Sequence, residues 1–256
     1  MKPRSLTATE IVGLPVIGAL SLILAWQFLV PALGVPAYIV PTPLAVLRTL
    51  GTEWRFLLSN AVPTWAEACL GFLLGNSLAV LLAIAFVYNP RFQAAYFPVV
   101  LLFNTIPVLA LAPIIILIFG LGMLPKVIIA ALICFFPTLV NTARGLNLAT
   151  ASELDLMHVL SASGWETFWR LRAPRSVPLL FASLRISATT CVIGAIVGEW
   201  IGSNQGLGAV IIQSTFNYQA ERLFAAVVLA SLSGLVFFAL VTLAERFFHR
   251  LNLSRA

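Results

Sequence analysis

Six stretches of the chain are apolar enough, and long enough, to cross a membrane as helices. They cover residues 11 to 31, 61 to 87, 93 to 119, 124 to 143, 177 to 200 and 223 to 245. A span needs about twenty largely apolar residues. Helices are the expected form because lipid cannot hydrogen-bond to the backbone. The pattern therefore predicts an all-α membrane protein with six transmembrane helices, forming one domain over residues 1 to 256.

Composition supports a membrane protein, and the distribution of charge predicts its orientation in the membrane. The chain is 61% hydrophobic, 9% charged and has a mean hydropathy of +1.02, which leaves no room for a separate soluble domain. The net charge of +6 lies mostly at the ends of apolar runs, the pattern of membrane orientation and not of nucleic-acid binding. One side receives Lys2, Arg4, Arg91, Arg144, Arg170, Arg172, Arg175, Arg246, Arg250 and Arg255, and the other Arg48, Arg55, Lys126 and Arg222. Both termini are predicted to be cytoplasmic, in the inner membrane of a bacterial cell.

An amphipathic segment follows the first span. Leu47, Leu50 and Trp54 share one face of a helix over residues 43 to 58, while Arg48 and Glu53 lie elsewhere. Such a pattern is typical of a helix lying in the membrane interface. We predict an external interfacial helix here.

The third span is interrupted by Pro98, Pro107 and Pro113. Proline removes a backbone donor, and broken backbone at membrane depth needs protein or water beside it. We therefore predict a substrate pathway around residues 104 to 113. Its candidate residues are Asn104, Thr105, Pro107 and Glu199. The alternative is a kinked packing helix.

Small and ionisable residues inside the spans have simpler explanations. Gly71 and Gly75, and likewise Gly194 and Gly198, form Gly-x-x-x-Gly pairs that permit close helix contact. Glu67, Arg185 and Glu199 lie near span ends, where interface positions suffice. The cysteines Cys69, Cys134 and Cys191 show no ligand spacing and are predicted to be buried packing residues without a metal.

The longest polar segment, residues 150 to 174, carries two helix-start signals. Thr150 with Glu153, and Ser163 with Glu166, have the spacing of capping boxes, so a short helix should break near Ser161 and restart. Its apolar residues are Leu154, Met157 and Leu160, and then Trp165, Phe168, Trp169 and Leu171. Such a surface is expected to dock on a partner protein.

Catalytic chemistry is not indicated. The sequence has no nucleotide-binding glycine loop, and no Ser/His or paired-Asp arrangement lies within a span. His158 and His249 fall in polar segments and are interpreted as surface residues. Energy for any transport must come from elsewhere.

The run from Asp155 to Pro174, DLMHVLSASGWETFWRLRAP, resembles the cytoplasmic "EAA" signature of bacterial ATP-binding-cassette importer permeases. Asp155 stands for the acidic residue, Ser161 for the glycine six positions later, Leu171 for the aliphatic residue and Ala173-Pro174 for Leu-Pro. Three further runs carry a second resemblance, which is to one group of these permeases. They are NTIPVLALAPIIILIFGLGMLPK, FFPTLVNTARGL and VGEWIGSNQGLGAVI. They resemble the nitrate, sulfonate and taurine permeases, including those for pyrimidine-type thiamine precursors.

The resemblance implies a type I importer permease with cytoplasmic coupling helices. Its expected partners are a second copy of the chain, two cytoplasmic ATPase subunits that hold ATP and Mg, and an external solute-binding protein, with lipid around the spans. It would carry a small polar, anionic or heteroaromatic solute. The resemblance assigns ATPase coupling to Glu153, Leu154, Asp155, Met157, Leu160, Ser161, Ala162, Trp165 and Pro174.

Two other functions compete with this interpretation. An ion-coupled secondary transporter would explain six spans but not the capped helix pair. An intramembrane enzyme would need polar catalytic groups at membrane depth, which the sequence does not supply.

Overall fold

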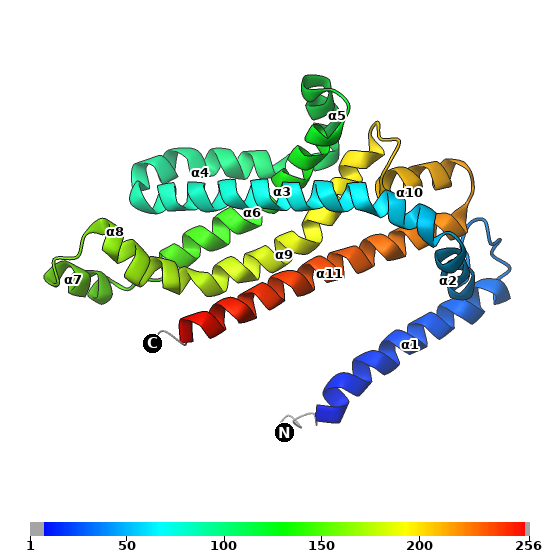
Figure 1. Ribbon diagram of the computed structural model, residues 1–256, viewed down its shortest axis with the longest axis horizontal. Helices are drawn as coiled ribbons and strands as arrows, with labels where there is room; N and C mark the ends of the chain where they lie inside the picture. The colour runs from blue at the N-terminus through cyan, green and yellow to red at the C-terminus, as the bar shows by residue number, and fades with distance from the viewer. Residues whose placement is uncertain (1–7, 254–256) are drawn as a thin grey trace. The chain divides into compact units, whose positions relative to one another are not determined.

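The computed structural model describes the backbone of residues 8 to 253 and the side chains of residues 13 to 248 and of Arg250, and every regular element among them is helical. The elements, shown in Figure 1, are α1 (Ala8–Ala32), α2 (Pro43–Thr52), α3 (Trp54–Tyr88), α4 (Pro90–Thr105), α5 (Val108–Phe119), α6 (Met123–Leu146), α7 (Ala151–Val159), α8 (Gly164–Thr167), the π-helix η1 (Phe168–Arg172), α9 (Ala173–Trp200), α10 (Leu207–Phe216) and α11 (Ala220–Leu253). Within this part of the chain, five helical stretches are long and apolar enough to span a membrane, and the bent pair α4 and α5 makes a sixth. The predicted all-α, six-span architecture is confirmed.

The described helices fall into two compact units. The first comprises residues 8 to 58 and 210 to 228, and the second residues 59 to 209 and 229 to 253.

In the first unit, the predicted helix over residues 43 to 58 is divided. α2 starts with Thr42 as its N-cap and ends at Thr52, and Trp54 begins α3. Glu53 lies at the break, where Arg222 holds its carboxylate with two bonds of 2.6 and 2.9 Å. This bidentate pair fixes the point at which the chain changes direction, which the apolar pattern alone did not indicate.

In the second unit, α6 lies against both α3 and α9 at glycine positions. A Cβ added to Gly75 of α3 would lie 2.9 Å from the Cα of Ala131, and one added to Gly198 of α9 would lie 2.9 Å from the Cα of Lys126. Gly71 and Gly194 face α6 in the same way. Both Gly-x-x-x-Gly pairs are therefore used for packing within the chain, which is the close helix contact that the sequence predicted.

The third span is broken where the sequence places Pro107. α4 and α5 meet at an angle of 99° with only Ile106 and Pro107 between them. Proline forces the preceding residue out of the helical region, and Ile106 has an extended backbone with ψ 125°. Pro98 and Pro113 remain inside helices. One of the three prolines therefore makes the predicted break.

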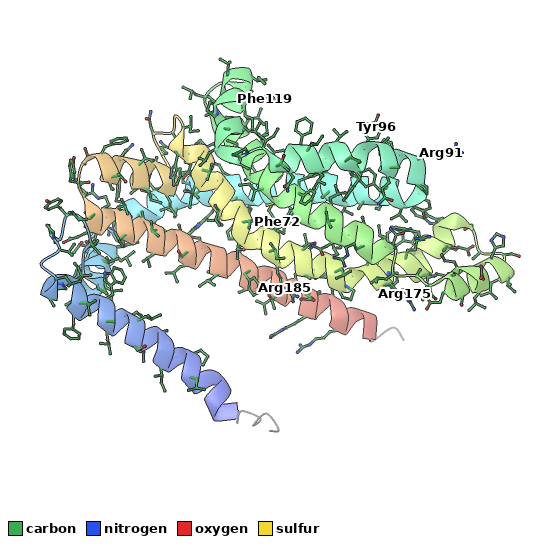
Figure 2. The ribbon with its side chains drawn as sticks, turned by 180° about the vertical axis from the view of Figure 1, so that it is seen from behind. Phe72, Arg91, Tyr96, Phe119, Arg175 and Arg185 are labelled. Carbon is green, nitrogen blue, oxygen red and sulfur yellow. The ribbon has the colours of Figure 1, made fainter. Side chains whose placement is uncertain are left out.

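Two expectations about isolated residues need correction. Cys134 and Cys191 are buried, as predicted, but Cys69 is exposed. Arg185, labelled in Figure 2, is not held by the membrane interface alone, because its guanidinium pairs at 2.5 Å with Glu245 of α11. This ion pair between two helices stabilises the arginine. The sequence did not indicate the pair, because the two residues are far apart along the chain.

Candidate functional site

The polar segment between α6 and α9 contains both predicted capping boxes. At α7, the Glu153 carboxylate accepts from the backbone N–H and the hydroxyl of Thr150, both at 2.9 Å. At α8, Glu166 accepts from the N–H of Ser163 at 2.9 Å, and the Ser163 hydroxyl accepts from the N–H of Glu166 at 3.2 Å. α8 then continues through η1 into α9, so the second short helix is the beginning of a span.

Two arginines attach this segment to the ends of the spans. Arg175 (Figure 2) pairs with Glu153 of α7 and donates to the carbonyl of Leu148 at 3.3 Å. Arg172 donates to the carbonyl of Leu146 at 3.0 Å. The pKa of Glu153 lies below its ordinary value, chiefly because of the two Thr150 bonds and also because Arg175 is beside it. A charge-assisted pair thus ties α7 to the start of α9, and Arg172 ties the start of α9 to the end of α6.

The break after α7 is a Schellman motif. The N–H of Ala162 bonds to the carbonyl of Met157, and that of Ser161 to the carbonyl of His158. Ser161 has a φ of 55°, in the left-handed region that favours glycine. The residue that takes the place of the signature glycine therefore has the backbone conformation for which glycine is suited.

The exposed apolar face of α7 differs from the predicted one. Leu160 is exposed, but Leu154 and Met157 are half-buried. Leu156 and Val159, which were not predicted for this face, are also exposed, by 57% and 81%. With Leu160, these two residues share one helical face, which the spacing of the predicted residues did not include. The Glu153–Arg175 pair sets the rotation of α7, which the spacing of Leu154, Met157 and Leu160 did not show.

The other assigned residues of this segment surround that face. Asp155 and Ser161 are exposed, Trp165 is 70% exposed, and Ala162 is half-buried. Pro174 lies exposed in the first turn of α9. Their role in coupling stays a prediction.

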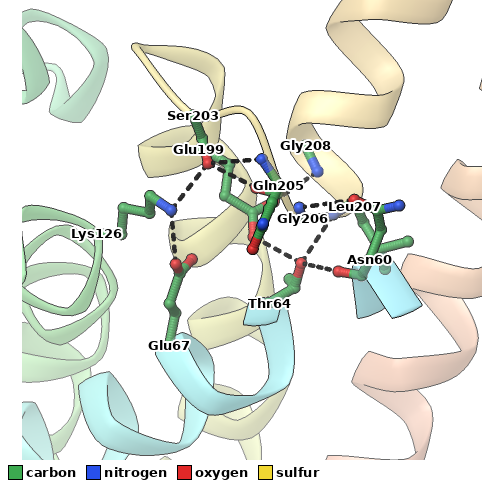
Figure 3. A network of polar contacts seen from close by, with 10 residues as sticks. All are labelled: Asn60, Thr64, Glu67, Lys126, Glu199, Ser203, Gln205, Gly206, Leu207 and Gly208. Atoms are coloured by element: carbon green, nitrogen blue, oxygen red, sulfur yellow. Dashed lines mark hydrogen bonds and ion pairs between the residues drawn. The ribbon is translucent and has the colours of Figure 1, made fainter. Parts of the chain in front are cut away.

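A buried polar network lies at the opposite end of α9 (Figure 3). Glu199 is 1% exposed. Its carboxylate accepts from the Thr64 hydroxyl at 2.6 Å and from the N–H of Gly208 at 2.6 Å. The Glu199 carboxylate is therefore enclosed, with its bonds directed at α3 and α10, and its role in a substrate pathway stays a prediction.

The same network closes the N-terminus of α10. Three successive backbone N–H groups, of Gly206, Leu207 and Gly208, bond to side-chain oxygens of Asn60, Thr64 and Glu199 respectively. Helix N-termini carry unpaired donors and partial positive charge, so an anionic carboxylate is favourable there. The turn before α10 is thereby held by α3 and α9.

Lys126 completes the network from α6. Its ammonium pairs with Glu67 at 2.7 Å and donates to the Ser203 hydroxyl at 2.9 Å. Glu67 is 2% exposed, so its predicted explanation as an interface residue is wrong. Asn60, Thr64, Lys126 and Ser203 were missed as partners. A usable signal existed, because Asn60, Thr64 and Glu67 recur at four and three residues on one face of an apolar helix.

The junction between α4 and α5, called the elbow below, forms a second candidate site apart from the buried network. Asn104 and Thr105 are exposed, and Asn104 lines a cavity of about 510 Å³ whose other lining residues are apolar, Phe103 and Phe135 among them. Pro107 begins α5 at this elbow. The predicted pathway residues are thus divided between the elbow and the buried network. Among the described residues, no three acidic, Cys or His side chains are placed to hold a metal ion.

These helices, the sharply broken span and the capped polar segment define a multi-pass membrane protein with the type I importer permease fold. The chain belongs to the family of binding-protein-dependent transport system inner membrane components, whose model matches residues 75–250, and it is an ABC transporter permease.

Relatives and a solved structure agree. A probable ABC transporter permease of Haemophilus influenzae is 34% identical over 96% of this chain and 98% of its own length. The formylaminopyrimidine transport permease ThiX of Halalkalibacterium halodurans is 33% identical over 94% of this chain and 95% of its own length. The fold matches a chain of the MetNI methionine ABC transporter in an inward-facing structure, with a TM-score of 0.55 and 18% identity over 82% of this chain and 97% of that one.

Proposed function

We propose that two copies of this chain form the transmembrane path of an ATP-driven importer in the bacterial inner membrane, with both termini cytoplasmic. Two cytoplasmic ATPase subunits would hold ATP and Mg, and an external solute-binding protein would deliver the solute. Closure of the ATPases would move α7 as a rigid lever and rock the spans between inward- and outward-facing states. The chain itself has no catalytic role in this scheme.

The observation that carries the proposal is the exposed apolar face of α7. Leu156, Val159 and Leu160 are all more than half exposed at a short helix that is capped and tied to α9 by Arg175. Exposed apolar residues grouped on one face mark a protein contact. Because Arg175 and Arg172 connect this segment to α9 and α6, force applied to α7 would reach both spans.

The solute is proposed to be small and polar, anionic or heteroaromatic. The heteroaromatic class has support from the formylaminopyrimidine permease among the relatives. The elbow cavity also favours it, because Asn104 is the one polar side chain in a lining that includes Phe103 and Phe135. Such a lining allows stacking and one hydrogen bond.

The docking test uses two substitutions on α7. Val159→Asp places an unpaired charge on the face proposed to enter the ATPase and should reduce ATPase co-purification by at least about tenfold. Ser152→Asp adds the same charge at an exposed polar position of that helix and should leave binding unchanged. Equal ATPase binding by parent and Val159→Asp would reject α7 as the coupling helix.

The pathway test concerns Asn104. Asn104→Leu removes a polar group from the elbow cavity without adding charge, so it should slow solute uptake while the complex still assembles. Normal uptake would return the elbow to the role of a packing kink. Uptake by the permease alone, driven by an ion gradient without the ATPase, would instead establish the secondary-transporter alternative.

A further inference from the structure

A large cavity lies beside the coupling segment in the second unit. Its volume is about 990 Å³, and its walls come from the end of α3, the end of α6, the segment from α8 to the start of α9, and the end of α11. It is separate from the apolar face of α7, whose residues do not line it. Two lining residues, Trp165 and Pro174, belong to the predicted coupling set, but the coupling role does not account for the part of the cavity that extends between the spans.

The chemistry of the wall changes with depth. At the rim lie Trp165 and Trp169, exposed by 70% and 55%. The buried Leu146 also lines the cavity, and its carbonyl accepts from Arg172, which lies outside the lining. Val80 and Leu180 lie two helical turns further in along α3 and α9, and both are aliphatic. None of the lining residues is charged, and the wall passes from aromatic side chains, with Arg172 beside them, to aliphatic ones.

A single unsatisfied hydroxyl lies between these levels. Thr142 lines the cavity one turn before the end of α6, is 2% exposed, and its Oγ1 has no hydrogen-bond partner among the described residues. A buried hydroxyl without a partner is unfavourable by about 1 to 3 kcal/mol. A ligand that brings an acceptor to this level would remove that penalty.

The wall is also locally irregular. The π-helix Phe168–Arg172 contributes Phe168 and Trp169 to the cavity. π-helical turns are rare and are frequent at functional sites. Here the π turn lies in the wall, between α8 and α9, and the rings of Phe168 and Trp169 meet edge to face at 5.1 Å.

We propose that this cavity binds one anionic phospholipid from the leaflet at this end of the spans. One acyl chain lies against Val80 and Leu180, the ester carbonyl accepts from Thr142, and the phosphate lies near Arg172. Tryptophan rings at the rim match the headgroup level, where they are enriched in membrane proteins. Basic pockets between transmembrane helices are known to suit anionic headgroups.

A phospholipid fits better than a soluble ligand or a protein segment. The cavity is lined by four of the spans, which membrane lipid would surround at high concentration, and the polarity of a phospholipid falls with depth in the order phosphate, ester, hydrocarbon. Four arginines, Arg144, Arg170, Arg172 and Arg175, lie in the segment around the rim against three acidic residues, Glu153, Asp155 and Glu166. Glu153 pairs with Arg175 and Glu166 with Arg170, so two arginines, Arg144 and Arg172, remain against one acid, Asp155, and this surplus favours an anionic headgroup.

The test uses the full-length permease in phosphatidylcholine nanodiscs, without ATPase or binding protein, so its result is independent of the proposed transport function. A phosphatidylglycerol probe carries a photoreactive group in its acyl chain, and crosslinks are mapped by peptide mass spectrometry. We expect labelling concentrated on residues 80 to 88 and 173 to 180. A phosphatidylcholine probe with the same chain should label these peptides several-fold less.

Substitutions separate the three levels of the site. Val177→Trp fills the cavity and should abolish the concentrated labelling, whereas Leu235→Trp, at a 62% exposed position of α11, should not. Thr142→Val keeps the side-chain shape and should weaken competition by unlabelled phosphatidylglycerol about fivefold. Arg172→Gln should weaken competition by unlabelled phosphatidylglycerol further, whereas Arg172→Lys should retain this competition.

Three results would overturn the proposal. Labelling spread evenly over the apolar surface and insensitive to Val177→Trp would mean ordinary surrounding lipid. Equal labelling by both probes would remove the anionic headgroup from the site. Absence of lipid labelling together with a crosslink between two copies at Trp169 would assign the cavity to a subunit contact.

Discussion

Removal of the Lys126 ammonium gives the sharpest test of the buried network. Lys126→Met keeps the length of the side chain but leaves Glu67, 2% exposed, without its cation. The second carboxylate oxygen of Glu67 has no hydrogen-bond partner among the described residues, so Lys126 is the only cation paired with this carboxylate there. Breaking a buried pair in this way costs about 3 to 5 kcal/mol. For a chain of this size, that corresponds to a fall in Tm of roughly 10 °C.

The assay is a double-mutant cycle on the detergent-solubilised permease, followed by thermal unfolding. Lys126→Met combined with Glu67→Leu removes both charges and should recover most of the lost stability, because an apolar pair of similar volume is often neutral or better. Arg170→Met, which breaks an exposed pair of 3.7 Å, should change stability by less than about 1 kcal/mol. If Lys126→Met alone is as stable as the double variant, Glu67 and Lys126 are not energetically coupled.

Three further predictions follow from single positions. Gly198→Val should disrupt the packing of α9 on α6, because even a Cβ there approaches Lys126 Cα at 2.9 Å; yield of folded protein should fall, while Gly13→Val, in open space, should be neutral. Ser161→Val should impair ATPase-coupled uptake without affecting membrane insertion, because a β-branched residue is strained at φ 55°, whereas Ser161→Gly should retain uptake. Glu153→Gln should loosen α7 to limited proteolysis at pH 7. Since the folded pKa of Glu153 is depressed, its contribution is present above the unfolded value of about 4.3 and is lost as pH falls through the folded pKa, so the difference from the parent should vanish in strong acid.

Local patterns were enough to predict much of this protein. Length and hydropathy indicated the spans, and Pro107 indicated the break in the third one. The spacing of Thr150 with Glu153 and of Ser163 with Glu166 predicted both helix starts. Helix caps and proline breaks depend on interactions within a few residues, and a span depends on the hydropathy of one continuous helix. Both can therefore be recognised in the sequence alone.

Rotation of a short helix and pairing between distant helices were not predictable in this way. Spacing selected Leu154 and Met157 as the docking face, but the Glu153–Arg175 pair turns α7 so that Leu156 and Val159 are exposed. Periodicity groups residues on a face without saying which face is outward. That choice depends on contacts made across the fold.

The sequence by itself determined that this chain is a helical membrane protein with a capped polar segment, because apolar length and cap chemistry act locally. Only the tertiary structure decided what its charged and small residues do. Glu67 meets Lys126, and Glu199 closes α10, because glycine contacts bring α3 and α9 against α6. Those partners are 59 or more residues apart, except for Glu199 and Gly208. A buried charge is stable only with a partner in place, and that place exists only once the helices have packed.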